Sequence, residues 1–284
     1  SRCPACRLNR NVADLSDPAH LEKWRAIECA KRRLIYSLLR LGLPIASQTD
    51  GTQRGLAFDF RASTKDEQVF TGHANGLITI NISEACSAER ERQRVALGEP
   101  YRTLVGHMRH EAGHFYWDLL VWDGGRIGEC RAIFGDETED YGEALKRHYA
   151  RGPREGWESS YVSSYAGAHP WEDFAETWTH YLHIVDTLDT AATFGLTVDP
   201  GRGGARAAIE IDPYDAPDID SLLAAWLPLT AAVNALNRSM GQPDLYPFDL
   251  APLAVAKLAF IHDLVLPASG ERAPAKGPAR AAAG

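Results

Sequence analysis

The sequence predicts an α+β fold that is mainly helical and carries a small antiparallel sheet. Two kinds of periodicity support this prediction. Apolar residues recur at three- and four-residue steps over several long segments, as on amphipathic helices, whereas residues 55–62 and 76–83 alternate apolar and polar side chains, as in strands. The chain has 284 residues, of which 45% are hydrophobic. That is enough apolar material for a globular core.

The first helix is expected to begin at Pro18. Asp17 can cap it, and proline suits the first helical turn. Gly42 is placed to end the helix. The apolar residues that recur at helical spacing are Trp24, Ile27, Leu34, Leu38 and Leu41.

Three short strands are expected next, formed by residues 55–62, Val69–Phe70 and 76–83. The Asn75-Gly76 pair is a strong signal for a hairpin turn in front of the last strand. Three antiparallel strands are too few to be stable as a domain, so they must pack on helices.

Further helices are expected along the rest of the chain, separated by glycine and proline. Residues 267–284 are rich in Ala, Pro and Gly and are expected to form a disordered tail. The expected helical segments are residues 87–94, 100–122, 138–150, 170–194, 218–239 and 249–265.

Composition excludes several classes of partner. The net charge is −8 and the pI is near 5.7, so nucleic acid is not the expected partner. No apolar run approaches the roughly 18 residues that span a bilayer, so no membrane partner is expected. Five scattered cysteines indicate a reducing compartment, and we expect the cytoplasm. Cys3 and Cys6 make only half of a zinc site, and we expect two free thiols at a frayed terminus.

The segment His110-Glu111-Ala112-Gly113-His114 fits the H-E-x-x-H pattern. Two histidines four residues apart on one helix can both reach a single ion. Glu111 lies beside them, where it can accept a proton from water activated by that ion. His107, one turn earlier, is expected to be a buried neighbour rather than another ligand.

A catalytic zinc ion needs a third protein ligand, and residues 164–183 offer candidates. Glu172 and Glu176 lie one turn apart on one helix face. One carboxylate can bind the metal while the other accepts a hydrogen bond from a ligand histidine. Residue spacing alone leaves open which carboxylate does which.

These motifs resemble those of known zinc peptidases. HEAGH followed by EDFAE resembles the gluzincin-type zinc metallopeptidases and is similar to the motif of anthrax lethal factor. The segments CRLNRNVADLSDP, AKRRLIYSLLRLGLP, GLITINI and HPWEDFAETW resemble the bacterial zinc-binding metallo-peptidases. This second resemblance spans residues 2–196.

The resemblance implies one catalytic Zn²⁺ ion held by His110, His114 and Glu172. It implies Glu111 as the general base, and Glu176 as the acceptor for the free N–H of a ligand histidine. The natural substrate would be a peptide or protein.

The resemblance also implies that Tyr165 donates a hydrogen bond to the oxygen that gains charge during hydrolysis. Tyr161 and His169 are the alternatives for this role. The strand Leu77–Ile82 would be the sheet edge along which an extended peptide lies.

The resemblance implies a zincin-like metallopeptidase domain over residues 13–266, with residues 1–12 as the remnant of a zinc ribbon. The expected function is zinc-dependent hydrolysis of peptide bonds. The alternatives are a zinc-stabilised protein-binding module with latent activity and a zinc hydrolase acting on a non-peptide amide. His180 and His183 are expected to be core or rim histidines.

Overall fold

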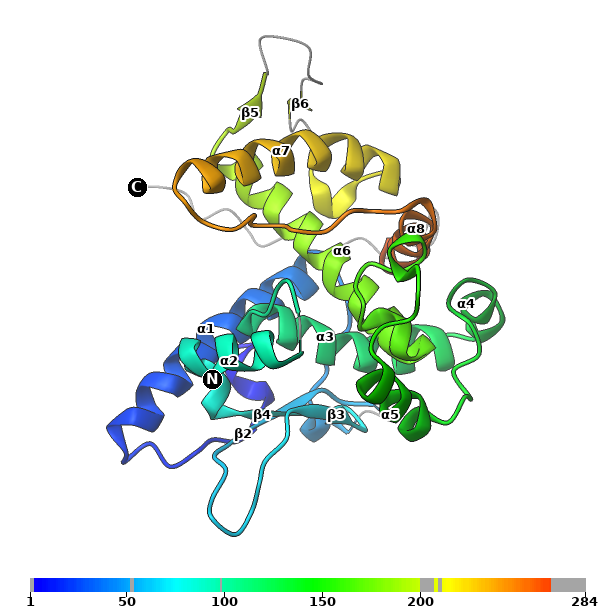
Figure 1. Ribbon diagram of the computed structural model, residues 1–284. Coiled ribbons are helices and arrows are strands. Elements are labelled where there is room, and N and C mark those ends of the chain that lie inside the picture. Colours follow the sequence, from blue (N-terminus) through cyan, green and yellow to red (C-terminus); the bar gives the residue numbers. More distant parts are fainter. Residues whose placement is uncertain (1–2, 52–53, 98, 200–206, 209–210, 267–284) are drawn as a thin grey trace.

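The computed structural model describes residues 3–51, 54–97, 99–199, 207–208 and 211–266, so the tail expected to be disordered lies outside the described residues. The fold is α+β and mainly helical, as predicted, with a small four-stranded sheet at one end and a two-stranded sheet at the other (Figure 1). The helices are α1 (Pro18–Arg40), α2 (Ser87–Leu97), α3 (Leu104–Tyr116), α4 (Ile127–Phe134), α5 (Tyr141–Arg151), α6 (Pro170–Thr193), α7 (Ile219–Ser239) and α8 (Pro252–Val265).

Helix α1 forms as its sequence predicts. The Asp17 carboxylate accepts a hydrogen bond from the Ala19 amide, and Pro18 occupies the first turn. Gly42 follows the helix with φ +68°, a conformation that favours glycine. The face with Leu34 and Leu38 is fully buried, so α1 forms part of the scaffold beneath α3.

The sheet is mixed, which corrects the prediction of an antiparallel one. Strand β2 pairs in parallel with both β1 and β4, and β3 pairs antiparallel with β4. The expected hairpin turn is present, with φ 50° at Asn75 and 79° at Gly76. The expected middle strand Val69–Phe70 is wrong, because residues 62–71 form a crossover and the strand begins at Gly72. The strands of this sheet are β1 (Asn9–Asn11), β2 (Ala57–Arg61), β3 (Gly72–Ala74) and β4 (Leu77–Asn81), and β5 (Thr197–Val198) and β6 (Ala207–Ala208) form a separate antiparallel pair.

The strand order β1-β2-β4-β3 places β4 inside the sheet and β3 at one edge. The expectation that Leu77–Ile82 forms the edge is therefore wrong. At the other edge, β1 pairs with β2, and Leu8 in front of it is 1% exposed. Ala5 is buried as well, whereas Cys3 is exposed, so the described chain is packed from Ala5 onward and the expectation of a frayed terminus is corrected only there.

The helix that carries the histidine motif is shorter than predicted. It begins at Leu104 because the Thr103 hydroxyl caps it by accepting from the Gly106 amide at 3.0 Å. It ends at Tyr116 and continues as a π-helical turn over Trp117–Trp122. Helix α4 was not predicted, since its eight residues give too short a periodic pattern.

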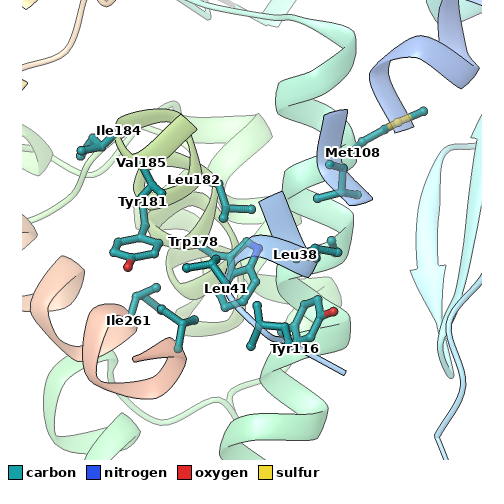
Figure 2. Packing of buried hydrophobic residues seen from close by; sticks show 14 of the residues in the cluster. Leu38, Leu41, Met108, Tyr116, Trp178, Tyr181, Leu182, Ile184, Val185 and Ile261 are labelled. Carbon is teal, nitrogen blue, oxygen red and sulfur yellow. The ribbon is translucent and has the colours of Figure 1, made fainter. Parts of the chain in front are cut away.

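Helices α1, α3, α6 and α8 share the main hydrophobic core (Figure 2). The Trp178 ring of α6 stacks on Tyr116 of α3 with centroids 4.9 Å apart. Leu38 of α1 and Ile261 of α8 lie near this pair in Figure 2, and both are fully buried. This packing fixes α3 against α6.

Helix α7 corrects the expectation that no segment is apolar enough to cross a bilayer. Its most apolar 18-residue window has a mean hydropathy of 1.4, and 39% of that window is buried. Leu222 and Trp226 are buried in the main core. Packing on the rest of the fold therefore accounts for part of this apolar character.

Candidate metal centre

Helices α3 and α6 lie side by side, and their contact positions the site (Figure 1). Gly113 makes this contact possible. A Cβ atom at Gly113 would lie 2.9 Å from Cα of Ala175, closer than ordinary contacts allow. The backbones therefore approach closely, and the histidines of α3 face the first turns of α6.

His110 and His114 of α3 and Glu172 of α6 converge at this contact. Their ligating atoms lie within 4.8 Å of one another, and all three residues are buried. His110 Nε2 is 2.9 Å from Glu172 Oε2, and His114 Nε2 is 3.7 Å from Glu172 Oε1. The structure thus brings together the three residues proposed as ligands from the sequence.

This cluster fits a zinc ion. Ligands about 2.1 Å from a tetrahedral ion lie roughly 3.4 Å from one another. The distances from Glu172 to His110 and to His114, 2.9 and 3.7 Å, lie on either side of this value. Among the described residues, no donor makes an aligned hydrogen bond to the buried Glu172 Oε2. Burial raises the pKa of Glu172, but the two imidazoles outweigh it and hold the pKa at about 2. An ionised carboxylate and two imidazoles are ligands that zinc prefers.

Glu176 lies beside the cluster rather than in it. Its Oε1 is 2.7 Å from Nδ1 of His110, the ring nitrogen that points away from Glu172. Its Oε2 accepts a hydrogen bond from the Ser163 hydroxyl at 2.6 Å. A carboxylate at Nδ1 keeps the proton there and leaves Nε2 as the metal-binding nitrogen.

Glu111 is held by contacts that the sequence did not predict. His107 Nε2 lies 3.2 Å from Glu111 Oε1, and His107 Nδ1 lies 2.5 Å from Oε2 of Glu84. The Thr71 hydroxyl in turn donates to Glu84. Burial lowers the pKa of His107, but the Glu84 and Glu111 carboxylates outweigh it and raise the pKa to about 9. The ring is therefore a donor to both carboxylates.

Tyr165 lies closer to the cluster than its two alternatives. Its ring centroid is 6.0 Å from that of His110. Tyr161 instead packs under the Lys257 ammonium, 4.1 Å from the ring centroid. His169 caps α6 by accepting from the Trp171 amide. Of the three candidates, Tyr165 is therefore the one beside the histidines.

Tyr141 contacts the cluster, although no sequence pattern predicts this contact. Its hydroxyl donates a 2.6 Å hydrogen bond to Oε1 of Glu172. It comes from the first turn of α5, and the fold alone brings α5 to this place.

The comparison with known families agrees with this geometry. A family model described as "Putative zinc-binding metallo-peptidase" matches residues 20–264. The chain belongs to this family.

Relatives of this chain occur in mycobacteria. Uncharacterized proteins of Mycobacterium tuberculosis and Mycobacterium bovis are 43% identical to it over 264 residues. The aligned region is 93% of this chain and 75% of each relative. No solved structure matches the chain significantly.

A cavity of about 230 Å³ opens beside the cluster of His110, His114 and Glu172, since His110 is also part of its lining. His110 and Glu111 line one end of it. The other lining residues come from the segment before α3, from α3, α5 and α6, from the loops before α6 and after α7, and include Tyr101, Tyr165, His180, His183 and Phe248. His180 and His183, expected at the core or rim, therefore line the same space as His110 and Glu111.

Proposed function

We propose that this chain is a single-zinc metallopeptidase in which His110, His114 and Glu172 hold the ion. The observation that carries the proposal is the convergence of two imidazoles and one carboxylate in a buried cluster with Glu111 beside it. A bound zinc ion supplies Lewis-acid activation of water and of the scissile carbonyl.

The protein's own residues divide the remaining work. Glu111 accepts a proton from the attacking water and returns it to the leaving amine. His107 holds the Glu111 carboxylate in place, and Glu176 orients His110. Tyr165 donates a hydrogen bond to the carbonyl oxygen as that oxygen gains charge.

Peptide is the substrate class that the sheet supports. Strand β3 is an edge strand next to α3, and the His73 ring in β3 lies 6.3 Å from the His114 ring. An extended peptide that pairs with β3 would pass beside the cluster. This arrangement favours a peptide over a non-peptide amide, and β3 replaces Leu77–Ile82 as the strand that we propose to bind it.

The binding-module alternative explains fewer contacts. A zinc ion that only stabilised the fold would need no open position beside it and no carboxylate like that of Glu111. Here Glu111 lines a cavity and is held by His107, in line with a role in catalysis.

The test combines metal analysis with cleavage of a peptide library, with and without a chelator. We expect Glu111→Gln to keep one zinc ion per chain and to lower kcat by about 10²–10⁴-fold. Glu172→Ala should lose the zinc. Glu129→Gln on exposed α4 is the matched control and should behave as the parent.

The outcomes separate the alternatives. Zinc binding without cleavage by the parent would favour the binding module, and equal cleavage by the parent and Glu111→Gln would refute Glu111 as the general base. Stoichiometric zinc in Glu172→Ala would point to Glu176 as the third ligand.

A further inference from the structure

Part of the cavity wall is built from aromatic rings. The Tyr101 ring meets the rings of His183 and Phe248 edge to face, with centroids 5.4 and 6.0 Å away. The His180 ring lies 4.5 Å from Phe248. Together with Gly106, these four residues form what we term the aromatic pocket. Such edges and faces pack well against another aromatic ring.

No unpaired charge faces the cavity among the described residues that line it. Arg102 Nη1 donates to both carboxylate oxygens of Glu99 at 3.1 and 3.0 Å. Glu176 and Glu111 are each held by a histidine. A charged side chain would therefore lose its hydration here without gaining a counter-ion.

The proton on His183 can be assigned from its partner. The Arg109 guanidinium can only donate, and its Nη1 lies against His183 Nδ1. Nδ1 is therefore the acceptor, and the proton is on Nε2. His183 is 8% exposed and lines the cavity, and its Nε2 lies on the side of Gly106. Burial and the Arg109 charge lower the pKa of His183, so the ring stays neutral.

Gly106 leaves the space in front of this N–H open. A Cβ atom at Gly106 would lie 3.5 Å from His183 Nε2 and 2.9 Å from the Thr103 hydroxyl. Any larger residue here would fill the space that the N–H faces. The aromatic pocket thus offers ring surfaces and, at His183 Nε2, one hydrogen-bond donor that borders the cavity.

We propose that the aromatic pocket binds the substrate side chain next to the scissile bond and selects an uncharged aromatic residue, tyrosine above all. Its tyrosyl oxygen would accept from His183 Nε2. The whole cavity, about 230 Å³, is smaller than the roughly 300 Å³ of the smallest drug-sized sites, so it suits a single side chain. This inference rests on the proposed peptidase function and adds its substrate class.

The test uses peptides that differ only at the residue flanking the cleaved bond, which is Tyr, Phe, Leu, Glu or Lys. We expect kcat/KM for Tyr to exceed that for Phe by about 3–10-fold, the contribution of one neutral hydrogen bond. Tyr should exceed Glu and Lys by about 100-fold or more. Each ratio is measured on one preparation, so a partly inactive sample does not change it.

Two variants separate the two features of the aromatic pocket. His183→Asn keeps an acceptor for Arg109 and removes the Nε2 donor. It should therefore abolish the preference for Tyr over Phe and leave the preference for aromatic residues over Leu unchanged. Phe248→Ala removes a ring and should reduce the preference for both aromatic residues over Leu. Phe194→Ala, at a residue 76% exposed and outside the cavity, is the control and should leave every ratio unchanged.

Failure of this inference can be told from failure of the proposed function. Zinc-dependent cleavage that needs Glu111 but shows no aromatic preference would overturn the inference and leave the peptidase standing. The affinities of zinc-loaded Glu111→Gln for the same peptides, measured by calorimetry, do not depend on turnover. Tighter binding of the Tyr peptide without cleavage by the parent would support the aromatic pocket but not the peptidase function. Equal affinities for all five peptides would overturn the aromatic pocket.

Discussion

Replacing Gly113 by alanine tests whether the close approach of α3 and α6 holds the metal cluster together. The added Cβ would lie 2.9 Å from Ala175 Cα and 3.2 Å from Trp178 Cδ1. Ordinary contacts begin at 3.4 Å, so the backbones must separate by about 0.5 Å. His110 and His114 move with one helix, and Glu172 moves with the other.

The expected magnitudes follow from this separation. Overpacking costs about 1–3 kcal/mol, and the better helix propensity of alanine offsets about 0.5–1 kcal/mol of it. We therefore expect Gly113→Ala to lower the free energy of unfolding by about 1–2 kcal/mol. Zinc–ligand bonds are only about 2.1 Å long, so a shift of this size should raise the zinc Kd by about tenfold or more.

The assay pairs urea unfolding of the metal-free protein with zinc competition against a chromophoric chelator. Gly128→Ala in α4 is the matched control, since a Cβ there meets nothing within 4 Å. It should stabilise the protein by about 0.5–1 kcal/mol and leave the zinc Kd unchanged. If Gly113→Ala stabilised the protein equally and bound zinc as the parent does, the reasoning would be refuted.

Three further perturbations test other contacts of the site. Tyr141→Phe removes the hydrogen bond to Glu172 and should raise the zinc Kd by about 10–100-fold in the same competition assay. An unchanged Kd would show that zinc binding does not need this hydrogen bond. His107→Phe frees the Glu111 carboxylate and should lower kcat about tenfold with zinc content and KM unchanged; a fall in zinc content instead would indicate a structural role. Burial lowers the pKa of His180 from 6.5 to about 4, so its neutral ring stabilises the fold above pH 6.5, and this contribution is lost as the pH falls toward 4. Between pH 7 and 5, urea unfolding should show the parent losing about 2 kcal/mol more than His180→Asn, and equal losses would contradict the assignment.

Local patterns predicted the parts of the site that lie within one helix. The pair His110 and His114 and the pair Glu172 and Glu176 each lie one turn apart, so helical geometry alone puts each pair on one face. The Asn75-Gly76 turn was likewise predicted, because its positive φ values are a local property. The pairing of β2 with β4 was not, since it depends on the crossover between them.

Contacts between distant segments could not be read from the chain. Tyr141 reaches Glu172 from a different helix, and Glu84 reaches His107 from the turn after β4. No sequence spacing predicts these two contacts, because helical and strand periodicity shows only which residues share a face of the same helix or strand.

The sequence by itself determined which residues can ligate a metal, on which helices they lie, and the helical class of the fold. Only the tertiary structure decided which carboxylate faces both imidazoles, which strand forms the edge, and which rings close the cavity. The physical reason is that the backbone hydrogen bonds of a helix relate only residues about one turn apart on that same helix. The approach of α3 to α6 depends instead on packing between residues far apart in the chain, such as Gly113 against Ala175.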